Sequence, residues 1–300
     1  MIPVTKTFLP DYDNFSNILK SAWNTGIITN NGPLVKKLSQ ELIEFLSVQN
    51  IQLVTNGTLA LQLAIKALNL HGEIITTPYS YVATTNAILW EGCKPVFVDV
   101  DPQTFCISPE LIEEAITKDT TAILATHVYG YPCDVTSIQK IADQHGLKVI
   151  YDAAHAFGVR LNGESLLNHG DCSTLSFHAT KLFHTVEGGA VVCKNKELET
   201  HIFLMSMFGH KGEDEYLEIG INAKMSELNA AMGLAVLPNV PSLIEARQLR
   251  SAWYDELLSG LGLMCPKAVP GLEYNYAYYP VIFPSHDVMM QVRAALQALD

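Results

Sequence analysis

Residues 176–189 read Ser-Phe-His-Ala-Thr-Lys-Leu-Phe-His-Thr-Val-Glu-Gly-Gly, with one lysine at position 181. The segment joins a run with β-strand character, Cys172–Phe177, to an apolar strand, Ala190–Cys193. The neighbours of Lys181 are aromatic, small or apolar, and such surroundings lower the pKa of an amine. A free amine can form a Schiff base with a carbonyl group. The alternative is an ordinary loop lysine that reaches solvent from a sheet edge.

Short apolar strands alternate with helices on the N-terminal side of this segment. The predicted strands are Ile51–Val54, Glu73–Thr76, Pro95–Val100, Thr121–Thr126 and Lys148–Tyr151, and the predicted helices are Leu59–Leu68, Tyr81–Trp90, Pro109–Ile116 and Val135–His145. Uninterrupted apolar strands are typical of a parallel sheet that is covered on both faces. The alternation therefore predicts an α/β fold with a doubly wound, mainly parallel sheet, whose ligands bind at the carboxyl ends of the strands.

The ends of the chain predict an arm and a second domain. Residues 1–32 form the arm, which includes a turn-rich loop at Thr25–Pro33 and leads into a helix with apolar positions from Leu34 to Leu46. Further predicted elements are a helix at 196–208, a polar loop at 208–220, a helix from Val240, a strand at Tyr276–Phe283 and a helix at Ser285–Leu299. We expect residues 1–239 to form the arm and a large domain, and residues 240–300 to begin a smaller C-terminal α+β domain.

Composition excludes several classes of protein. The chain has 300 residues, 48% hydrophobic and 17% charged, which suffices for a sizeable core. A net charge of -12 argues against a nucleic-acid surface. Six cysteines without a CxxC pair indicate a reduced, intracellular protein. Residues 1–6 do not read as a signal peptide, and the uncharged run Ile74–Trp90 is broken by Pro78. We therefore expect a soluble, cytoplasmic protein without a metal site.

Asp152 stands at the predicted carboxyl end of the strand that begins at Lys148. A carboxylate there can keep the pyridine nitrogen of pyridoxal phosphate (PLP) protonated, through a charge-assisted hydrogen bond of about 1.5–3 kcal/mol. His155, three residues later, can bond the phenolic oxygen or the ring edge of the same cofactor. A helix N-cap at Asp152 and a buried core histidine at position 155 are the alternatives.

Gly57 and Thr58 offer a site for an anion. A strand, the turn Asn56-Gly57-Thr58 and a helix place free backbone N–H groups at a helix N-terminus, which carries roughly half a positive charge. Together with Lys181 and Asp152, this turn supplies what PLP needs: an amine, a partner for the ring nitrogen and a phosphate site. A plain turn is at least as frequent in α/β proteins.

Over nearly its whole length the sequence resembles the sugar-nucleotide aminotransferases of the DegT/DnrJ/EryC1/StrS family, which have PLP fold type I. The segments that carry the resemblance are, in chain order, Asn56–Thr58, Thr77–Thr84, His127–Gly130, Asp152–Gly158, Ser176–Lys181, Glu187–Gly189 and Gly220–Asn222. Each motif alone is weak, but their order along the chain makes the resemblance specific.

The resemblance implies a role for each site residue. Lys181 forms the Schiff base with PLP and later moves the proton, while Asp152 pairs with the pyridine nitrogen. Tyr81 stacks on the ring, and His155 lines it. The phosphate ligands are Gly57, Thr58 and Ser176 of one subunit and Asn222 of the other subunit of a homodimer. Glu187 helps to order the loop after the lysine. For Asn222 on its own, a turn residue or the cap of its own helix is the alternative.

The resemblance also implies an activity. L-glutamate donates an amino group to a nucleotide-linked 4-keto-6-deoxyhexose, expected to be dTDP-4-keto-6-deoxyglucose, because residues 3–10 and 177–189 look most like enzymes that make dTDP-4-amino-4,6-dideoxyglucose. Such products belong to deoxyamino-sugar and O-antigen biosynthesis. The alternatives are a 3-keto-sugar aminotransferase, a PLP-dependent sugar dehydratase and a non-catalytic regulatory homologue. Dehydratase relatives have histidine where Lys181 stands, and an intact Lys181–Asp152 pair counts against a regulatory protein.

Two departures from the family pattern affect the site. Lys224 stands where members often have arginine, so a phosphate contact there has one hydrogen bond at best. Family members also continue beyond the length of this chain, into a part of the small domain that contributes to the substrate side. We therefore expect residues 240–300 to form an incomplete small domain.

Overall fold

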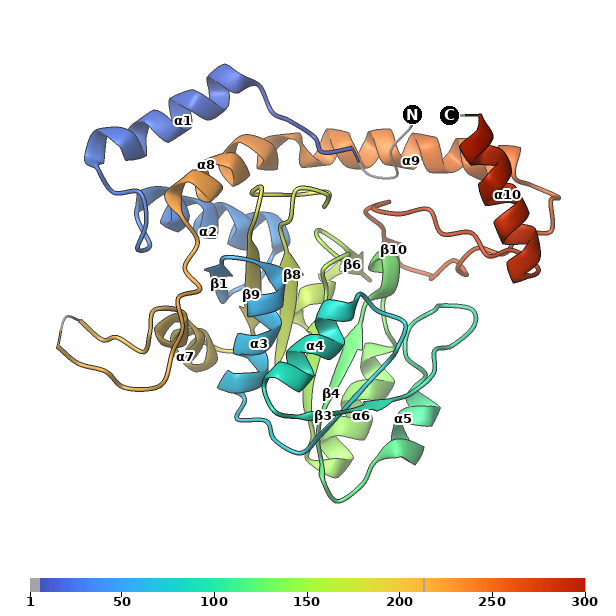
Figure 1. Ribbon diagram of the computed structural model, residues 1–300, viewed down its shortest axis with the longest axis horizontal. Helices are drawn as coiled ribbons and strands as arrows, with labels where there is room; N and C mark the ends of the chain where they lie inside the picture. Colours follow the sequence, from blue (N-terminus) through green and yellow to red (C-terminus); the bar gives the residue numbers. More distant parts are fainter. Residues whose placement is uncertain (1–5, 213, 300) are drawn as a thin grey trace.

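The structure, a computed structural model, describes residues 6–212 and 214–299, so the first five residues of the predicted arm lie outside it. A seven-stranded sheet forms its centre, in the order β1-β9-β8-β5-β4-β2-β3 (Figure 1). The strands are β1 (Ile51–Val54), β2 (Glu73–Thr76), β3 (Lys94–Phe97), β4 (Thr120–Thr126), β5 (Lys148–Asp152), β8 (Cys172–Ser176) and β9 (Gly189–Cys193). The strands predicted between residues 51 and 193 all form, with bounds that move by a few residues at most.

Five neighbouring strands, β3, β2, β4, β5 and β8, run parallel, whereas β9 is antiparallel to both β8 and β1. The predicted mainly parallel sheet is therefore confirmed. The reversal at β9 follows from its connection to β8, because residues 177–188 contain no crossover helix, which a parallel neighbour would normally need. The lysine segment instead turns back at the carboxyl end of β8.

Helices cover both faces of the sheet. They are α2 (Pro33–Leu46), α3 (Gly57–Ala67), α4 (Val82–Trp90), α5 (Pro109–Ala115), α6 (Val135–His145) and α7 (Lys196–Ser206). Side chains of β4 divide between two hydrophobic clusters: Ile123 belongs to the cluster that includes α2, and Leu124 to the cluster that includes α3. The period of two in a strand explains this division. Burial on both faces is the reason that the strands read as continuous apolar runs.

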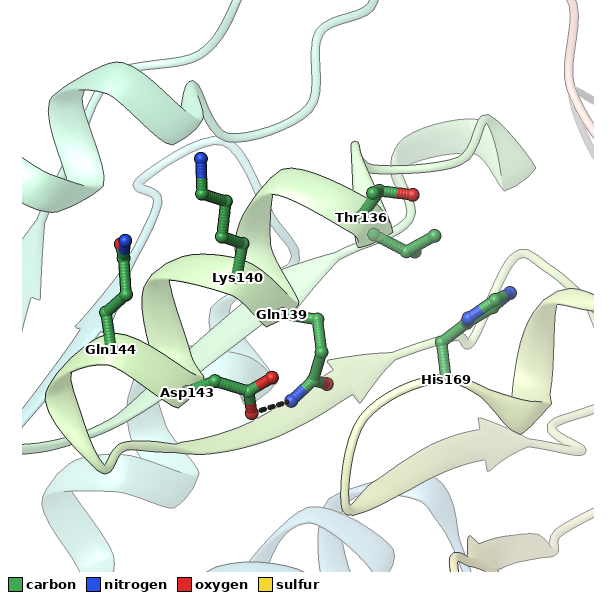
Figure 2. A pocket seen from close by; sticks show the side chains of 7 residues that line it. Thr136, Gln139, Lys140, Asp143, Gln144 and His169 are labelled. Carbon is green, nitrogen blue, oxygen red and sulfur yellow. Dashed lines mark hydrogen bonds between the residues drawn. The ribbon is translucent and has the colours of Figure 1, made fainter.

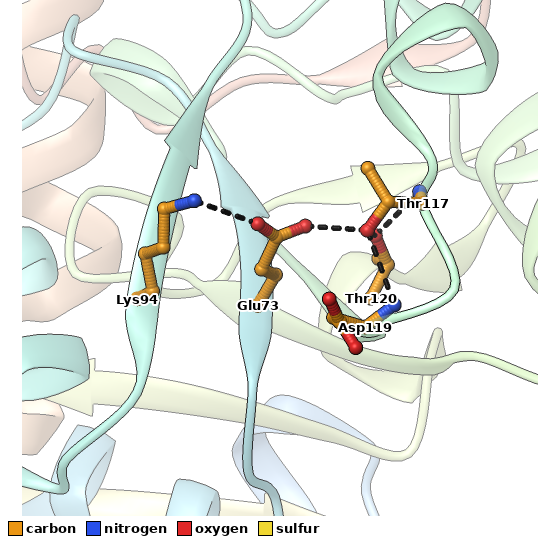
Figure 3. Close-up of polar contacts among 5 residues, drawn as sticks. All are labelled: Glu73, Lys94, Thr117, Asp119 and Thr120. Carbon is orange, nitrogen blue, oxygen red and sulfur yellow. Dashed lines mark hydrogen bonds and ion pairs between the residues drawn. The ribbon is translucent and has the colours of Figure 1, made fainter.

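A polar cluster closes the amino ends of β2 and β3 (Figure 3). The carboxylate of Glu73 accepts hydrogen bonds from Lys94 Nζ at 2.8 Å and from Thr117 Oγ1 at 2.6 Å. These two bonds lower the pKa of Glu73. Structural contacts therefore occupy the amino ends of β2 and β3, whereas ligands of a parallel sheet bind at the carboxyl ends of its strands.

The C-terminal part begins with a long helical run. α8 (Glu227–Val236), the 3-10 turn η3 (Leu237–Asn239) and α9 (Val240–Leu257) follow one another across the top of Figure 1. The predicted arm contains a helix that we did not predict, α1 (Tyr12–Thr25), which packs along α8. The predicted domain boundary after residue 239 falls within the helical run, so it stays a prediction.

The predicted strand at Tyr276–Phe283 is wrong. Only Ile282 makes a β-bridge, to Met264, and Tyr276 has a positive φ of 51°. No strand of the described chain lies alongside this segment, so its backbone has no ladder to join. Sheet pairing occurs earlier, where β10 (Leu272–Glu273) joins the small hairpin of β6 (Arg160–Leu161) and β7 (Glu164–Ser165).

The remaining elements are β6 (Arg160–Leu161), β7 (Glu164–Ser165), the 3-10 turns η1 (Val128–Gly130) and η2 (Leu166–Asn168), and α10 (His286–Ala298). Within residues 6–212 and 214–299, no helix combines the length and the apolar character that a membrane span requires.

Candidate active site

A cavity of about 620 Å³ opens at the carboxyl ends of the central strands. Its lining includes eight of the nine residues to which the resemblance gives a role, namely Gly57, Thr58, Tyr81, Asp152, His155, Ser176, Lys181 and Glu187. The predicted residues come from positions more than 120 apart in the chain, and the parallel topology brings them together because the strand ends share one edge of the sheet. Asn222 does not line this cavity.

A second hollow, of about 590 Å³, lies along the outer face of α6 (Figure 2). Its polar side chains belong mainly to a solvated helix surface, and Gln139 donates a hydrogen bond to Asp143 at 2.8 Å. His169 is the one lining residue that comes from outside α6. Reactive groups therefore converge at the first cavity and not here.

Lys181 lies in the connection between β8 and β9, where its backbone N–H donates to the carbonyl of His178 at 2.9 Å. Burial lowers the pKa of Lys181, and the nearby carboxylate of Asp152 partly opposes this effect. β8 lies inside the sheet, between β9 and β5, and Lys181 is only partly exposed, which counts against the alternative of a lysine reaching solvent from a sheet edge. A lowered pKa makes the free amine more available to a carbonyl group.

Asp152, the last residue of β5, is only 6% exposed. One carboxylate oxygen, Oδ2, accepts a hydrogen bond from Thr84 Oγ1 at 2.7 Å, and Oδ1 accepts one from the Ala154 N–H at 3.1 Å. Residues 153–158 form turns and no helix, so the N-cap alternative for Asp152 is wrong. Thr84 was not predicted as a partner, and no sequence signal links it to a residue 68 positions away.

His155 presents a single hydrogen-bond donor. Its Nδ1 accepts from the backbone N–H of Tyr129 at 3.2 Å. Burial and the positive charge of Lys181 lower the pKa of His155 to about 3. The ring is therefore neutral at pH 7, and its proton is on Nε2 because Nδ1 is an acceptor.

Tyr129 adopts a strained backbone conformation, with a φ of 57°. Two hydrogen bonds hold it there: its N–H donates to His155, and its carbonyl accepts from the Tyr274 hydroxyl at 2.7 Å. The phenol of Tyr129 in turn lies 2.9 Å from the phenol of Tyr79. These contacts hold Tyr129 in its strained conformation as part of an aromatic wall of the cavity, to which Tyr278 also contributes.

The first turn of α3 forms the predicted anion site. Asn56 caps the helix by accepting the Leu59 N–H at 2.9 Å, which leaves the N–H groups of Gly57 and Thr58 without a partner inside the helix. A Cβ on Gly57 would lie 2.8 Å from Ser176 Cβ, so glycine is required for this close approach of α3 to the end of β8. Backbone donors and a hydroxyl thereby gather at one point.

Asn222 is exposed, and its side chain accepts a hydrogen bond from Lys224. The following helix, α8, is capped by Ser226, so the alternative that Asn222 caps its own helix is wrong. Its contact with the phosphate of a neighbouring subunit stays a prediction, as do the individual roles of the residues in the cavity.

The sequence profile of the DegT/DnrJ/EryC1/StrS aminotransferase family matches residues 11–299. The chain belongs to this family. It is 46% identical, over 285 residues, to a dTDP-4-amino-4,6-dideoxy-D-glucose transaminase of Shigella dysenteriae, covering 94% of this chain and 77% of the relative. Identity to the Escherichia coli transaminase of the same name is 43% over 283 residues, with coverage of 94% and 76%.

Solved structures agree with this assignment. The aminotransferase matches DesI, determined in the presence of its TDP-sugar product, with a TM-score of 0.92 and 33% identity. The match covers 98% of this chain and 77% of the DesI chain. The predicted PLP fold type I is therefore confirmed, as are the family, the aminotransferase activity and PLP as the cofactor.

The residues of the cavity fit PLP. Lys181 provides an amine, Asp152 a buried carboxylate for the ring nitrogen, and the Gly57-Thr58 turn with Ser176 a phosphate site. These three groups line one cavity, as a cofactor with an aldehyde, a ring nitrogen and a phosphate requires.

Proposed function

We propose that this aminotransferase transfers the amino group of L-glutamate to C4 of a nucleotide-linked 4-keto-6-deoxyhexose, with dTDP-4-keto-6-deoxyglucose as its substrate. The observation that carries the proposal is a lysine of lowered pKa that shares a cavity with a buried carboxylate. The choice of sugar and nucleotide rests on the two transaminases at 46% and 43% identity, both of which are named for the dTDP-linked 4-amino sugar.

In this proposal each side chain has a defined task. Bound PLP supplies an electron sink for the carbon next to the amino nitrogen. Lys181 Nζ is the point of attachment and, as a free amine, carries a proton to and from that carbon. Asp152 keeps a proton on the ring nitrogen, and His155 Nε2–H donates toward the ring edge. The N–H groups of the Gly57-Thr58 turn and the Ser176 hydroxyl bind the phosphate, and Tyr81 covers the ring.

The alternatives differ in what they require of Lys181. A sugar dehydratase of this fold has histidine at that position, and a regulatory homologue has no need of a lysine with a lowered pKa. A 3-keto-sugar aminotransferase uses the same groups, so only the product separates it from the proposed enzyme.

The test is to identify the product. The purified protein is incubated with L-glutamate and one keto sugar at a time. The keto sugars are the dTDP-linked 4-keto and 3-keto deoxysugars and their UDP- and GDP-linked counterparts. Mass spectrometry detects the exchange of oxygen for an amino group, and NMR locates the nitrogen. We expect amination at C4 of the dTDP-linked sugar, and none with the Lys181→Ala variant. Amination at C3, or loss of water without nitrogen transfer, contradicts the proposal.

The proposal includes a cytoplasmic homodimer with shared active sites. Two observations support shared sites: Asn222 lies outside the cavity of its own chain, and the adjoining loop exposes Tyr216, Leu217 and Ile219, the last to 83%. Closed two-fold dimers are the commonest symmetric assembly, so each subunit would give and receive one asparagine.

Subunit mixing tests this arrangement. Lys181→Ala and Asn222→Ala proteins, each weakly active, are combined and allowed to exchange subunits. In a mixed dimer with shared sites, one site carries both defects and the other carries neither, so part of the activity returns. Absence of recovery despite proven exchange, or an active monomer in light scattering, contradicts the shared site.

A further inference from the structure

Thr84 lies behind Asp152 in the interior of the protein. It belongs to the first turn of α4 and is 0% exposed. Its hydroxyl donates to Asp152 Oδ2 at 2.7 Å, while the Ala154 N–H donates to Oδ1 at 3.1 Å. The buried carboxylate therefore has one donor on each oxygen, and rotation about its Cβ–Cγ bond would break both hydrogen bonds.

The direction of the Thr84 hydroxyl is unusual for a helix. A threonine in a helix often bonds a carbonyl of the preceding turn, or faces solvent. Thr84 instead reaches a residue 68 positions away on the central sheet. Its own backbone N–H donates to the carbonyl of Tyr81 at 3.1 Å, so both residues belong to the same turn. Tyr81 lines the cavity, as does Asp152. One hydrogen bond thus ties two parts of the site together.

We infer that Thr84 is a positioning residue: it fixes the carboxylate of Asp152 toward the ring nitrogen of the cofactor and sets the first turn of α4, with Tyr81, against the end of β5. This inference rests on the proposed function, in which Asp152 is the partner of the ring nitrogen. Thr84 itself acts through Asp152 and does not line the cavity.

Two substitutions separate the hydroxyl from the methyl group. Thr84→Val keeps the shape and removes the donor, and Thr84→Ser keeps the donor and removes the methyl. We expect turnover to fall roughly 10–100-fold in Thr84→Val, with an unchanged KM for the sugar nucleotide, and to stay within about threefold in Thr84→Ser. Thermal unfolding of the cofactor-free proteins should differ little between the two variants.

A spectroscopic titration gives a second readout. In the PLP-loaded protein, the absorbance of the Lys181-linked cofactor reports protonation of the linkage. A proton held firmly on the ring nitrogen gives the ring a positive charge. This charge disfavours a second positive charge on the protonated linkage, because like charges repel. Thr84→Val should therefore raise the midpoint of the titration by about 0.5–1 pH unit. Asp152→Asn should raise it further, and Thr84→Ser should leave it at the wild-type value.

The outcomes are distinguishable. A Thr84→Val protein with wild-type turnover and midpoint overturns the role of Thr84 and leaves the proposed function intact. Equal damage from Thr84→Ser and Thr84→Val overturns it as well, because the methyl group would then be responsible. A wild-type protein that binds no PLP overturns both the proposed function and this inference. If Thr84→Val does not fold, Thr84→Ala is the hydroxyl-free protein to compare with Thr84→Ser.

Discussion

His127, directly after β4, is a buried neutral histidine that supports the active site. It is 0% exposed, and its ring stacks on Tyr151 with centroids 4.5 Å apart. The backbone N–H of His127 donates to the carbonyl of Asp152 at 3.0 Å, and the ring Nδ1 accepts from the backbone N–H of Cys133 at 3.1 Å. Burial is the main cause that lowers the pKa of His127 from 6.5 to about 3. Protonation of this ring should therefore destabilise the fold in acid.

The sign and size of the effect follow from the two pKa values. Between pH 6.5 and about 3 the unfolded chain binds a proton at His127 and the folded chain does not, so stability is fully present above pH 6.5 and is lost as the pH falls. At pH 5, which is 1.5 below the unfolded value, the loss is about 2 kcal/mol. Near pH 3 it approaches about 5 kcal/mol.

The substitution His127→Asn isolates the pH-dependent contribution of His127 to stability, because the asparagine oxygen can still accept a hydrogen bond from the Cys133 N–H. Urea unfolding, followed by tryptophan fluorescence, is measured for both proteins at pH 7.5 and pH 5.0. The stability advantage of the wild type should shrink by about 2 kcal/mol between these values, since all other titrating groups are shared. The control is His286→Asn, at a histidine whose side chain is 77% exposed. An advantage that is the same at both pH values refutes the reasoning.

Three further predictions concern the cofactor site. Borohydride reduction of the PLP-loaded protein should label the Lys181 peptide, and Lys181→Ala should still bind PLP without turnover; a label on another lysine contradicts the assignment. Asp152→Asn removes the charge that holds the ring-nitrogen proton, so turnover should fall by orders of magnitude, each factor of ten corresponding to about 1.4 kcal/mol. The circular dichroism spectrum should stay unchanged. Near-normal turnover would limit Asp152 to a structural role. Gly57→Ala places a Cβ 2.8 Å from Ser176 Cβ. Equilibrium titration should therefore show that the affinity for PLP is lowered about tenfold. An unchanged affinity would show that α3 can move away from β8 at no cost.

The sequence by itself determined the elements whose residues are local. β2 forms at Glu73–Thr76, as predicted, because an apolar run of this kind suits a buried parallel strand whatever its neighbours are. α6 forms at Val135–His145 because apolar residues recur at helical spacing between a capping Asp134 and Gly146, which has a φ of 67°. Lys181, Asp152 and the Gly57-Thr58 turn were found in the same way, since each follows a strand and parallel strands end at one edge.

Tertiary structure alone decided the contacts between distant residues. The strand predicted at Tyr276–Phe283 has a suitable pattern, but a strand needs a partner, and no local signal tells whether one lies alongside. Thr84 reads as an ordinary helix residue until the fold places its hydroxyl 2.7 Å from Asp152. Tyr278 enters the cavity from the far end of the chain. In each case the determining energy is an interaction between residues separated by many positions, which a sequence pattern of short range does not contain.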